Sequence, residues 1–187
     1  KFILMKTVNI FNDVKKIHPT IHSDTRGSFS EDYNYEKFSK IGITDSFVQD
    51  NISISKKKGT IRGLHFQLNK HAQSKLIKVI SGSILDVFVD LRRDSVNFEK
   101  YSSIDLNEGD GWLYIPRGYA HGFCTLQDDT VVMYKVDNYF NSDNDSGIIF
   151  NDDFFQINWP VEEEHAVISE KDKSLSKWSN IKEKIGF

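Results

Sequence analysis

Short hydrophobic runs separated by turn signals fill the middle of the chain. The runs "SKLIKVI" and "ILDVFVDL" flank the turn "SGS", "WLYIP" follows the turn "NEGDG", and "TVVMYKV" follows the turn-like "QDD". Short strands at regular spacing with tight turns are typical of antiparallel sandwiches and barrels. We therefore expect an all-β protein built on antiparallel strands.

One of these strands, "ILDVFVDL", has two faces of different character, because successive side chains of a strand point to opposite sides of a sheet. One face carries only aliphatic residues, namely Leu85, Val87, Val89 and Leu91. The opposite face carries Ile84, Asp86, Phe88 and Asp90. Its aspartates indicate that this second face looks at water or at a polar cavity, so we expect a small barrel whose mouth is polar.

Two segments have the spacing of helices. The stretch "YNYEKFSKIG" (33–42) ends in Gly42, which is a helix stop signal. The stretch "SEKDKSLSKWSNIKEKI" (169–185) places Leu175, Trp178 and Ile181 at helical spacing. We predict a helix in each segment, the second one over about residues 169–185.

Composition indicates one folded domain and argues against several partner classes. The 187 residues are 39% hydrophobic and 13% aromatic, and they contain no repeat or linker, so we expect a single domain over residues 1–187. The 24 basic and 27 acidic residues give a net charge of −3 without a basic block. This distribution argues against nucleic acid or a membrane surface as a partner.

Location follows from the cysteine content and the hydrophobic runs. The single cysteine, Cys124, excludes a disulfide framework and favours a reducing compartment. No run approaches transmembrane length, and the start "KFILMKTVNI" is too short for a signal peptide. We expect a cytoplasmic protein, with Met5 as a candidate initiator and residues 1–4 upstream of it.

Two histidines occur in glycine-containing, apolar surroundings, His65 in "GTIRGLHFQ" and His121 in "IPRGYAHGF". They could be ligands of one metal, buried structural histidines, or a base and its helper. A metal site needs three or four converging His, Asp, Glu or Cys groups. The residues nearest in the pattern are instead Gln67, on the same strand face as His65, and Lys75, which is a poor ligand while protonated. A metal is therefore not expected.

Three further residues each have a structural and a chemical interpretation. Lys75 begins a strand and is either solvated or a cation held near a developing anion, such as an enolate oxygen. Tyr134 is either a core tyrosine or a proton donor. Asp172 follows Ser169 in "SEKD", the signature of a helix capping box, and is alternatively a catalytic carboxylate.

Arg62 and His65 are three positions apart on one predicted strand. Strict alternation would point them to opposite faces of the sheet. Gly63 between them could permit a bulge that re-aims one of the two side chains. Without such a bulge, Arg62 would be a surface residue.

The two histidine stretches, "GTIRGLHFQ" and "IPRGYAHGF", occur together with "DTRGSFSEDYN", "FVQDNIS", "HAQSKLIKVISG", "DVFVDLRRDS", "MYKVDNYF", "INWP" and "ISEKD". Taken in chain order, from about residue 24 to residue 172, the nine stretches resemble the dTDP-4-dehydrorhamnose 3,5-epimerases. The resemblance implies a cupin-like antiparallel β-barrel, or jelly roll, with a few short peripheral helices. It also implies an epimerase that inverts C3 and/or C5 of a nucleotide-linked 4-keto sugar through an enolate, with no metal or other cofactor.

The resemblance also implies roles for individual residues. His65 would be the general base, Asp172 its partner, and Tyr134 the acid on the opposite face of the sugar. Lys75 would stabilise the enolate oxygen. The implied substrate contacts are Arg26, Glu31, Gln49, Asn51, Arg62 and His121.

A homodimer is implied as well, because members of this family exchange their N-terminal strand between subunits. Arg26 and Glu31, which by themselves look like a turn leading into a strand, would then serve the neighbouring subunit's site. The expected partners are a nucleotide-sugar substrate and a second copy of the chain.

Several recognition positions depart from the family pattern. Ser28 and Phe29 replace paired aromatics, "LHFQ" replaces "LHYQ", and Ser146 and Phe150 replace an arginine and a tryptophan. A dTDP-linked 6-deoxyhexose is therefore the default substrate, while a GDP-linked heptose and action at C3 alone stay open. A sugar-nucleotide 3,4-ketoisomerase and a non-catalytic binding module are the remaining alternatives.

Overall fold

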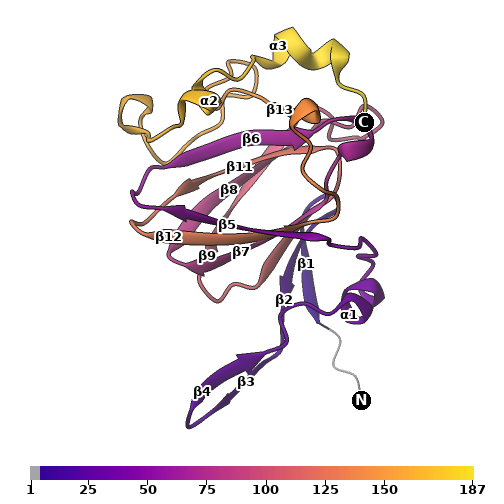
Figure 1. The fold of residues 1–187 in the computed structure, drawn as a ribbon, viewed down its shortest axis with the longest axis vertical. Helices are drawn as coiled ribbons and strands as arrows, with labels where there is room; N and C mark the ends of the chain where they lie inside the picture. The colour runs from indigo at the N-terminus through magenta and orange to yellow at the C-terminus, as the bar shows by residue number, and fades with distance from the viewer. Residues whose placement is uncertain (1–4) are drawn as a thin grey trace.

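The computed structural model describes residues 5–187, and the prediction about residues 1–4 lies outside the described residues. The described chain consists mainly of antiparallel strands arranged in two large sheets and a separate hairpin (Figure 1). Its helices are short and lie at the periphery. This arrangement confirms the all-β, antiparallel, cupin-like fold expected from the sequence.

The sheets are defined by their strand order. The first has six strands, in the order β1 (Lys6–Phe11), β2 (Val14–His18), β10 (Trp112–Ile115), β7 (Lys75–Ser81), β12 (Thr130–Val136) and β5 (Gln49–Ser55). The second has five, in the order β13 (Asp145–Gly147), β6 (Ile61–Gln67), β11 (Tyr119–Thr125), β8 (Ser83–Asp90) and β9 (Tyr101–Asn107). The hairpin pairs β3 (Ile21–Asp24) with β4 (Gly27–Ser30) and projects away from the barrel (Figure 1).

The main core lies between the two large sheets. It combines Ile77 and Val132 from the six-stranded sheet with Ile84, Phe88 and Phe123 from the five-stranded sheet. Such inward-facing side chains from both sheets are what hold a sandwich or barrel closed. The packed interior fills one part of the barrel and leaves room for a cavity elsewhere.

Strand β8 shows how the alternation in the sequence is used. Ile84 and Phe88 share one face, as the alternation predicts, but this face packs into the core between the sheets and does not look at water. The aliphatic face, which includes Val87 and Val89, is covered by the C-terminal segment with Trp178. Both faces are therefore buried, and the aspartates of this strand bond to His121 and Arg92 in place of water.

The first predicted helix is confirmed in shortened form as α1 (Tyr35–Lys40). The Asn34 side chain accepts a hydrogen bond from the N–H of Lys37, which caps the helix N-terminus. The helix ends just before Gly42, whose φ of +82° is a left-handed conformation that glycine adopts readily. None of the helices in residues 5–187 is long and apolar enough to cross a membrane.

The second predicted helix, over residues 169–185, is wrong. The segment forms α2 (Glu170–Lys173), α3 (Trp178–Ile181) and a 3-10 turn, η4 (Lys182–Lys184), instead of one helix. Between α2 and α3, Ser176 forms a β-bridge with Ile148, and its carbonyl accepts a hydrogen bond from Ile149. These tertiary contacts interrupt a helix that local periodicity favoured. Further 3-10 turns are η1 (Asn69–His71), η2 (Ser142–Asn144) and η3 (Glu163–His165).

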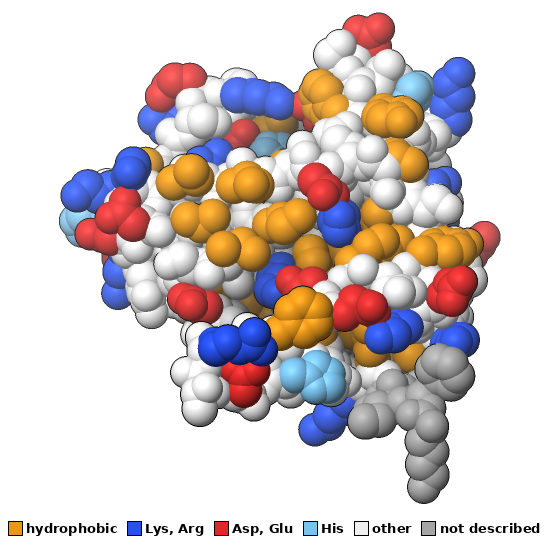
Figure 2. All heavy atoms as spheres, turned by 60° about the horizontal axis from the view of Figure 1, so that its bottom comes forward, with side chains coloured by type: hydrophobic (Ala, Val, Ile, Leu, Met, Phe, Trp, Pro, Cys, Tyr) orange, Lys and Arg blue, Asp and Glu red, His pale blue; other side chains and the backbone are white. Residues whose placement is uncertain are grey.

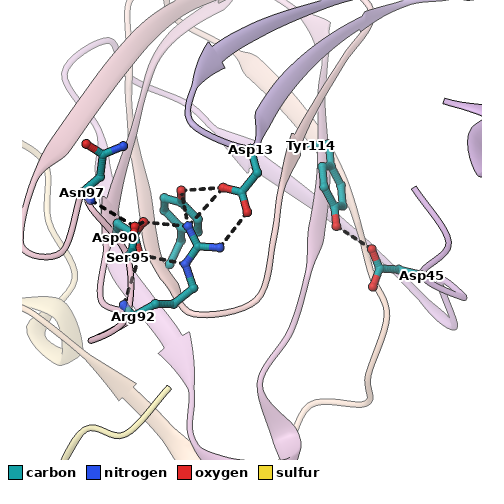
Figure 3. Close-up of polar contacts among 8 residues, drawn as sticks. Asp13, Asp45, Asp90, Arg92, Ser95, Asn97 and Tyr114 are labelled. Carbon is teal, nitrogen blue, oxygen red and sulfur yellow. Dashed lines mark hydrogen bonds and ion pairs between the residues drawn. The ribbon is translucent and has the colours of Figure 1, made fainter. Parts of the chain in front are cut away.

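A polar network that the sequence did not single out ties together several loops and strands (Figure 3). Nη1 of Arg92 lies 2.6 Å from Oδ2 of Asp13, in the turn between β1 and β2, and Nη2 lies 2.6 Å from Oδ2 of Asp90. The hydroxyl of Tyr119 donates to Asp13 and accepts from Arg92. Arg92 thereby links the first hairpin to the end of β8.

Candidate active site

A bulge in β6 determines where its polar side chains point. Across the β6–β11 pair, His65 faces His121 and Arg62 faces Phe123, so β6 has one more residue than β11 between these positions. Gly63 lies in the bulge with φ of +119°. As a result, Arg62 and His65 line the same cavity, which confirms the predicted re-aiming at Gly63.

The close approach of the two strands explains why position 63 is glycine. A Cβ atom on Gly63 would lie 2.6 Å from the Cα of Gly122 and 2.7 Å from the carbonyl oxygen of His121. Real Cβ atoms do not come this close to backbone atoms, so any other side chain would push β6 and β11 apart.

The cavity opens between the two large sheets and has a volume of about 660 Å³. A cavity of this size accommodates a small organic ligand. The C-terminal segment forms one of its walls through residues 167–172. The lining residues that carry polar groups are Ser53, Thr60, Arg62, His65, Gln67, Gln73, Lys75, His121, Tyr134, Asp145, Ser169, Lys171 and Asp172.

His65 and Asp172 form a hydrogen-bonded pair in this cavity. Nε2 of His65 lies 2.9 Å from Oδ1 of Asp172, and the N–H of Gly63 donates to Oδ2 at 3.0 Å. Burial opposes ionisation of Asp172, but these hydrogen bonds hold its pKa below the ordinary value, so it is a carboxylate. The His65 side chain is 33% exposed, which leaves the imidazole accessible from the cavity.

The capping-box interpretation of Asp172 is correct only in part. Ser169 caps α2, because its hydroxyl oxygen accepts a hydrogen bond from the backbone N–H of Asp172 at 3.1 Å. The Asp172 side chain does not complete the capping box, since it bonds to Gly63 and His65 instead. The cap therefore positions a carboxylate whose own hydrogen bonds lead to the imidazole.

Lys75 is buried beside His65. Its Nζ donates a weak hydrogen bond to the carbonyl oxygen of His65 at 3.4 Å, and the residue is 8% exposed. Burial lowers the pKa of Lys75 to about 8, although the charges of Asp86 and Asp145 oppose this shift. The interpretation of Lys75 as a solvated lysine is therefore wrong, because the ammonium lies in the cavity wall.

Tyr134 reaches the cavity from the other sheet. It belongs to β12 in the six-stranded sheet, whereas His65 belongs to β6 in the five-stranded sheet, and both line the cavity. Burial raises the pKa of Tyr134, so its hydroxyl stays protonated at neutral pH. The cavity thus has an imidazole on one sheet and a phenol on the other.

His121 lines the same cavity next to His65. Nε2 of His121 lies 2.8 Å from Oδ2 of Asp86, which is completely buried. Burial lowers the pKa of His121, although the Asp86 carboxyl opposes the shift, so we assign a neutral ring. His121 is consequently both a hydrogen-bonded buried histidine and a residue of the cavity wall.

The remaining predicted contacts lie at the rim or outside the cavity. Arg62 lines the cavity mouth, and its Nε donates to Oγ of Ser55 at 3.2 Å. Gln49 and Asn51 bond to each other at 2.9 Å on β5 and are not among the lining residues, although the neighbouring Ser53 is.

Arg26 and Glu31 do not line the cavity of their own chain. Arg26 lies at the tip of the β3–β4 hairpin and pairs with Asp24 at 2.6 Å. Glu31 pairs with Lys37 of α1 at 2.7 Å. The structure therefore does not bring these two residues together with the cavity residues of the same chain.

Reasoning from the sequence missed several residues of the cavity, among them Lys171, Asp145 and Phe140. Nζ of Lys171 lies 2.5 Å from Oδ2 of Asp145, and Nε2 of Gln67 donates to Oδ1 of Asp145 at 2.9 Å. Phe140 adds an exposed ring to the lining. Lys171 and Phe140 could have been found because they lie in the stretches "ISEKD" and "MYKVDNYF", whereas Asp145 lies in polar, turn-like sequence without a pattern. In residues 5–187 there is no group of three or more His, Cys, Asp or Glu residues that could hold a metal ion.

Comparison with known proteins gives one consistent result. The family model of dTDP-4-dehydrorhamnose 3,5-epimerase matches residues 9–180. The epimerase of Shigella flexneri is 40% identical over 162 residues, which cover 86% of this chain and 88% of that protein. The epimerase of Escherichia coli strain K12 is 41% identical over 165 residues, covering 87% and 88%.

Solved structures agree in fold over nearly the whole chain. The epimerase of Bacillus anthracis strain Ames, with TDP and PPi bound, has a TM-score of 0.89 and 47% identity, and the match covers 92% of this chain and 99% of that one. The 3,5-epimerase of Legionella pneumophila, in complex with dTDP-4-keto-L-rhamnose, has a TM-score of 0.90 and 35% identity, and the match covers 97% of each chain.

Proposed function

The chain belongs to the dTDP-4-dehydrorhamnose 3,5-epimerase family, and we propose that it inverts C3 and C5 of a dTDP-linked 4-keto-6-deoxyhexose. The observation that carries this proposal is the cavity in which the His65–Asp172 pair and Tyr134 come from different sheets. Inversion of a carbon centre needs a base on one face and an acid on the other, and this pair of groups supplies both.

The reaction uses the acidity that a ketone gives to its neighbours. His65 takes the proton from C3 or C5, and the C–H electron pair moves toward the C4 carbonyl to form an enolate. Tyr134 then donates its phenolic proton to the same carbon from the opposite face, which inverts the centre. His65 and Tyr134 return to their starting forms by exchanging protons with solvent, so the net reaction consumes nothing.

Asp172 and Lys75 stabilise the charges that form. The Asp172 carboxylate holds the ring of His65 and stabilises the imidazolium after proton abstraction, as the 2.9 Å contact supports. The Lys75 ammonium stabilises the enolate oxygen in a buried setting, where such a charge acts strongly. Positioned acid–base groups contribute about 10²–10⁴-fold in rate, so Lys75 must supply much of the remainder.

The same arrangement accounts for catalysis without a cofactor. The carbonyl at C4 acidifies the hydrogens at C3 and C5 alike. One base and one acid can therefore invert both carbons, provided that the sugar ring is repositioned between the two steps. The Bacillus epimerase binds TDP and PPi, and the Legionella epimerase binds dTDP-4-keto-L-rhamnose. These thymidine nucleotides support a dTDP sugar over a GDP-linked heptose, and the family match supports an epimerase over a ketoisomerase or a binding module.

Substrate contacts and dimerisation belong together in this proposal. Arg62 and His121 contact the substrate from the cavity wall, and Gln49 and Asn51 from β5 beside it. Arg26 belongs to the projecting β3–β4 hairpin (Figure 1), and Glu31 follows this hairpin in the chain. Neither residue lines its own cavity, so they contact the substrate of a partner subunit. The chain acts as a homodimer that exchanges this N-terminal hairpin.

An exposed apolar surface supports the dimer. Val8, Ile52, Ile54 and Ile80 of the six-stranded sheet are 42–68% exposed, and hydrophobic side chains gather on the side of the molecule seen in Figure 2. Exposed apolar patches of this kind mark interaction surfaces.

We place the chain in the cytoplasm as a single catalytic domain, an assignment that rests on its one free cysteine, Cys124, and on its composition.

Proton NMR in heavy water tests the proposed function. A panel of dTDP- and GDP-linked 4-keto sugars is incubated with the protein, and the signals of H3 and H5 are followed. We expect loss of both signals, fastest with the dTDP-linked 4-keto-6-deoxyhexose. Loss at C3 alone would identify a single-centre epimerase, and no exchange with any sugar would exclude the proposed chemistry. Analytical ultracentrifugation of the same sample tests the dimer.

A further inference from the structure

A second histidine–aspartate pair lies in the wall of the cavity, and the mechanism above gives its carboxyl group no role. Nε2 of His121 is 2.8 Å from Oδ2 of Asp86. Asp86 is 0% exposed and is not among the residues that line the cavity. Burying a carboxyl group destabilises a protein unless the group is paired with a charge or hydrogen-bonded.

The contact with Asp86 leaves one ring nitrogen of His121 for the cavity. Among residues 5–187, no group forms a hydrogen bond with Nδ1 of His121, and Nδ1 is not one of the fully buried polar atoms that lack a partner. Because the ring lines the cavity, Nδ1 is the atom that can meet a ligand. Which nitrogen carries the proton decides whether Nδ1 is a donor or an acceptor.

Burial and the neighbouring groups act in opposite directions on the ionisation of Asp86. Burial raises the pKa of Asp86, but the buried ammonium of Lys75 and the ring of His121 oppose this shift. Lys75 in turn depends on the charges of Asp86 and Asp145, since its own hydrogen bond is only to the carbonyl oxygen of His65. A neutral Asp86 would leave the Lys75 ammonium without one of its two counter-charges.

We propose that Asp86 is a positioning residue of this site, which holds His121 in the neutral Nε2–H tautomer so that Nδ1 accepts a hydrogen bond from a hydroxyl group of the sugar. The identity of the ligand rests on the proposed function, whereas the state of the ring does not. With Lys75 as the donor to the enolate oxygen, the wall then presents a donor and an acceptor side by side. A protonated Asp86 would donate to Nε2 of His121 and shift the ring proton to Nδ1. The wall would then present two donors, Nδ1–H and the Lys75 ammonium.

The tautomer can be read from the protein without substrate. Long-range ¹H–¹⁵N correlation NMR on ¹⁵N-labelled protein distinguishes the two neutral forms of an imidazole, and the spectrum of H121Q identifies the signals of His121. We expect His121 to carry its proton on Nε2 at neutral pH. A wild-type ring protonated on Nδ1 overturns the proposal, whatever the activity.

Asp86→Asn tests the consequence for catalysis. The substitution keeps the size of the side chain, removes its charge, and lets the amide donate to Nε2, so the ring should change to the Nδ1–H form. We expect kcat/KM for epimerisation to fall about tenfold to hundredfold, the effect of losing a hydrogen bond to a charged group. A switched ring with unchanged kcat/KM, or an unchanged ring, contradicts the proposal.

Asp152→Asn is the matched control. Asp152 is also buried, at 3% exposure, and accepts hydrogen bonds from the backbone N–H groups of Phe154 and Trp178 away from the cavity. It should leave both the His121 tautomer and kcat/KM within about twofold of wild type, because it removes a buried charge that does not face the site. If the wild-type protein exchanges no protons in any 4-keto sugar, the proposed function fails, and the tautomer measurement still decides the assignment of Asp86.

Discussion

His65 and Asp172 are 107 residues apart in the chain, yet Nε2 of one lies 2.9 Å from Oδ1 of the other. Two local features produce this contact. The bulge at Gly63 aims His65 into the cavity and offers its own N–H to Asp172, and the Ser169 cap holds the start of α2 against β6. A strand irregularity and a one-turn helix together form the pair on which the proposed chemistry depends.

Asp172→Asn should lower kcat/KM about tenfold to hundredfold, because the amide cannot stabilise an imidazolium as a carboxylate does. The NMR assay of sugar epimerisation measures the effect. Ser169→Ala is the control, since it removes the cap of α2 and should cost about 1 kcal/mol of stability while keeping the carboxylate. Equal losses of activity in the two variants would mean that the charge of Asp172 contributes no more than the placement of α2 by its cap.

Tyr134→Phe should separate proton removal from inversion. His65 can still remove a proton and return a deuteron from solvent to the same face, so exchange at the ring carbons should continue. Formation of the inverted product should fall about 10²–10⁴-fold, because the acid on the opposite face is missing. Exchange and inversion are followed in one NMR experiment, and a parallel loss of both would assign Tyr134 a different role.

The pH dependence of kcat/KM should report the buried Lys75. Its pKa is about 8, so the ammonium that stabilises the enolate is present below this pH and is lost as the pH rises through it. The raised pKa of Tyr134 keeps the phenol protonated in the same range. We therefore expect activity to decline above about pH 8.

Substitutions at Lys75 test the assignment of this alkaline limb. Lys75→Arg keeps a positive charge and should move the decline to higher pH. Lys75→Ala should reduce kcat about 10²–10³-fold, the range for losing one oxyanion donor, and remove the limb. A decline near pH 8 that persists in the alanine variant would have to come from another group.

The sequence was most informative where the expected alternation of a strand conflicted with the residues present. Alternation placed Arg62 and His65 on opposite faces, and the glycine between them indicated where a bulge could resolve the conflict. Alternation also predicted which residues of β8 share a face, although the face with the aspartates packs into the core. These features depend on residues adjacent in the sequence, so the periodicity of the sequence can predict them.

Features that depend on distant contacts were not predictable in this way. The spacing of Leu175 and Trp178 suits a helix, but Ser176 forms a β-bridge with Ile148 and the helix breaks. Asp145 enters the cavity because β13 pairs with β6, and its surrounding polar sequence carries no sign of that pairing. Only the folded topology brings such residues to the site.

The network around Arg92 should contribute to stability, and it should weaken in acid. Partial burial opposes the ionisation of Asp13 and Asp90. Hydrogen bonds from Arg92 nevertheless hold the pKa values of both carboxyl groups below 3.8. Their stabilising effect is therefore complete above the ordinary carboxyl pKa and is lost as the pH falls through the lowered values. Arg92→Met leaves the buried Asp90 unpaired and should cost about 3 kcal/mol. Urea unfolding at pH 7 measures the cost, and an unchanged midpoint would show that the network contributes nothing.

Gly63→Ala should disable the site while leaving most of the fold intact. The new Cβ would lie 2.6 Å from the Cα of Gly122, at a φ of +119° that alanine rarely adopts, so β6 must shift. Misplacing a catalytic group by about 1 Å costs on the order of 10²-fold in rate, and His65 lies two residues away.

Gly109→Ala separates backbone strain from the clash. Gly109 has a φ of +84°, but a Cβ there would meet no atom within 4 Å. This control should lose about 1 kcal/mol of stability from the strained backbone and retain full activity. Thermal unfolding and the NMR assay on both variants make the comparison. If Gly63→Ala behaved like Gly109→Ala, the close contact of β6 with β11 would not be what aims His65, and the bulge would have to be maintained by the Asp172 hydrogen bond alone.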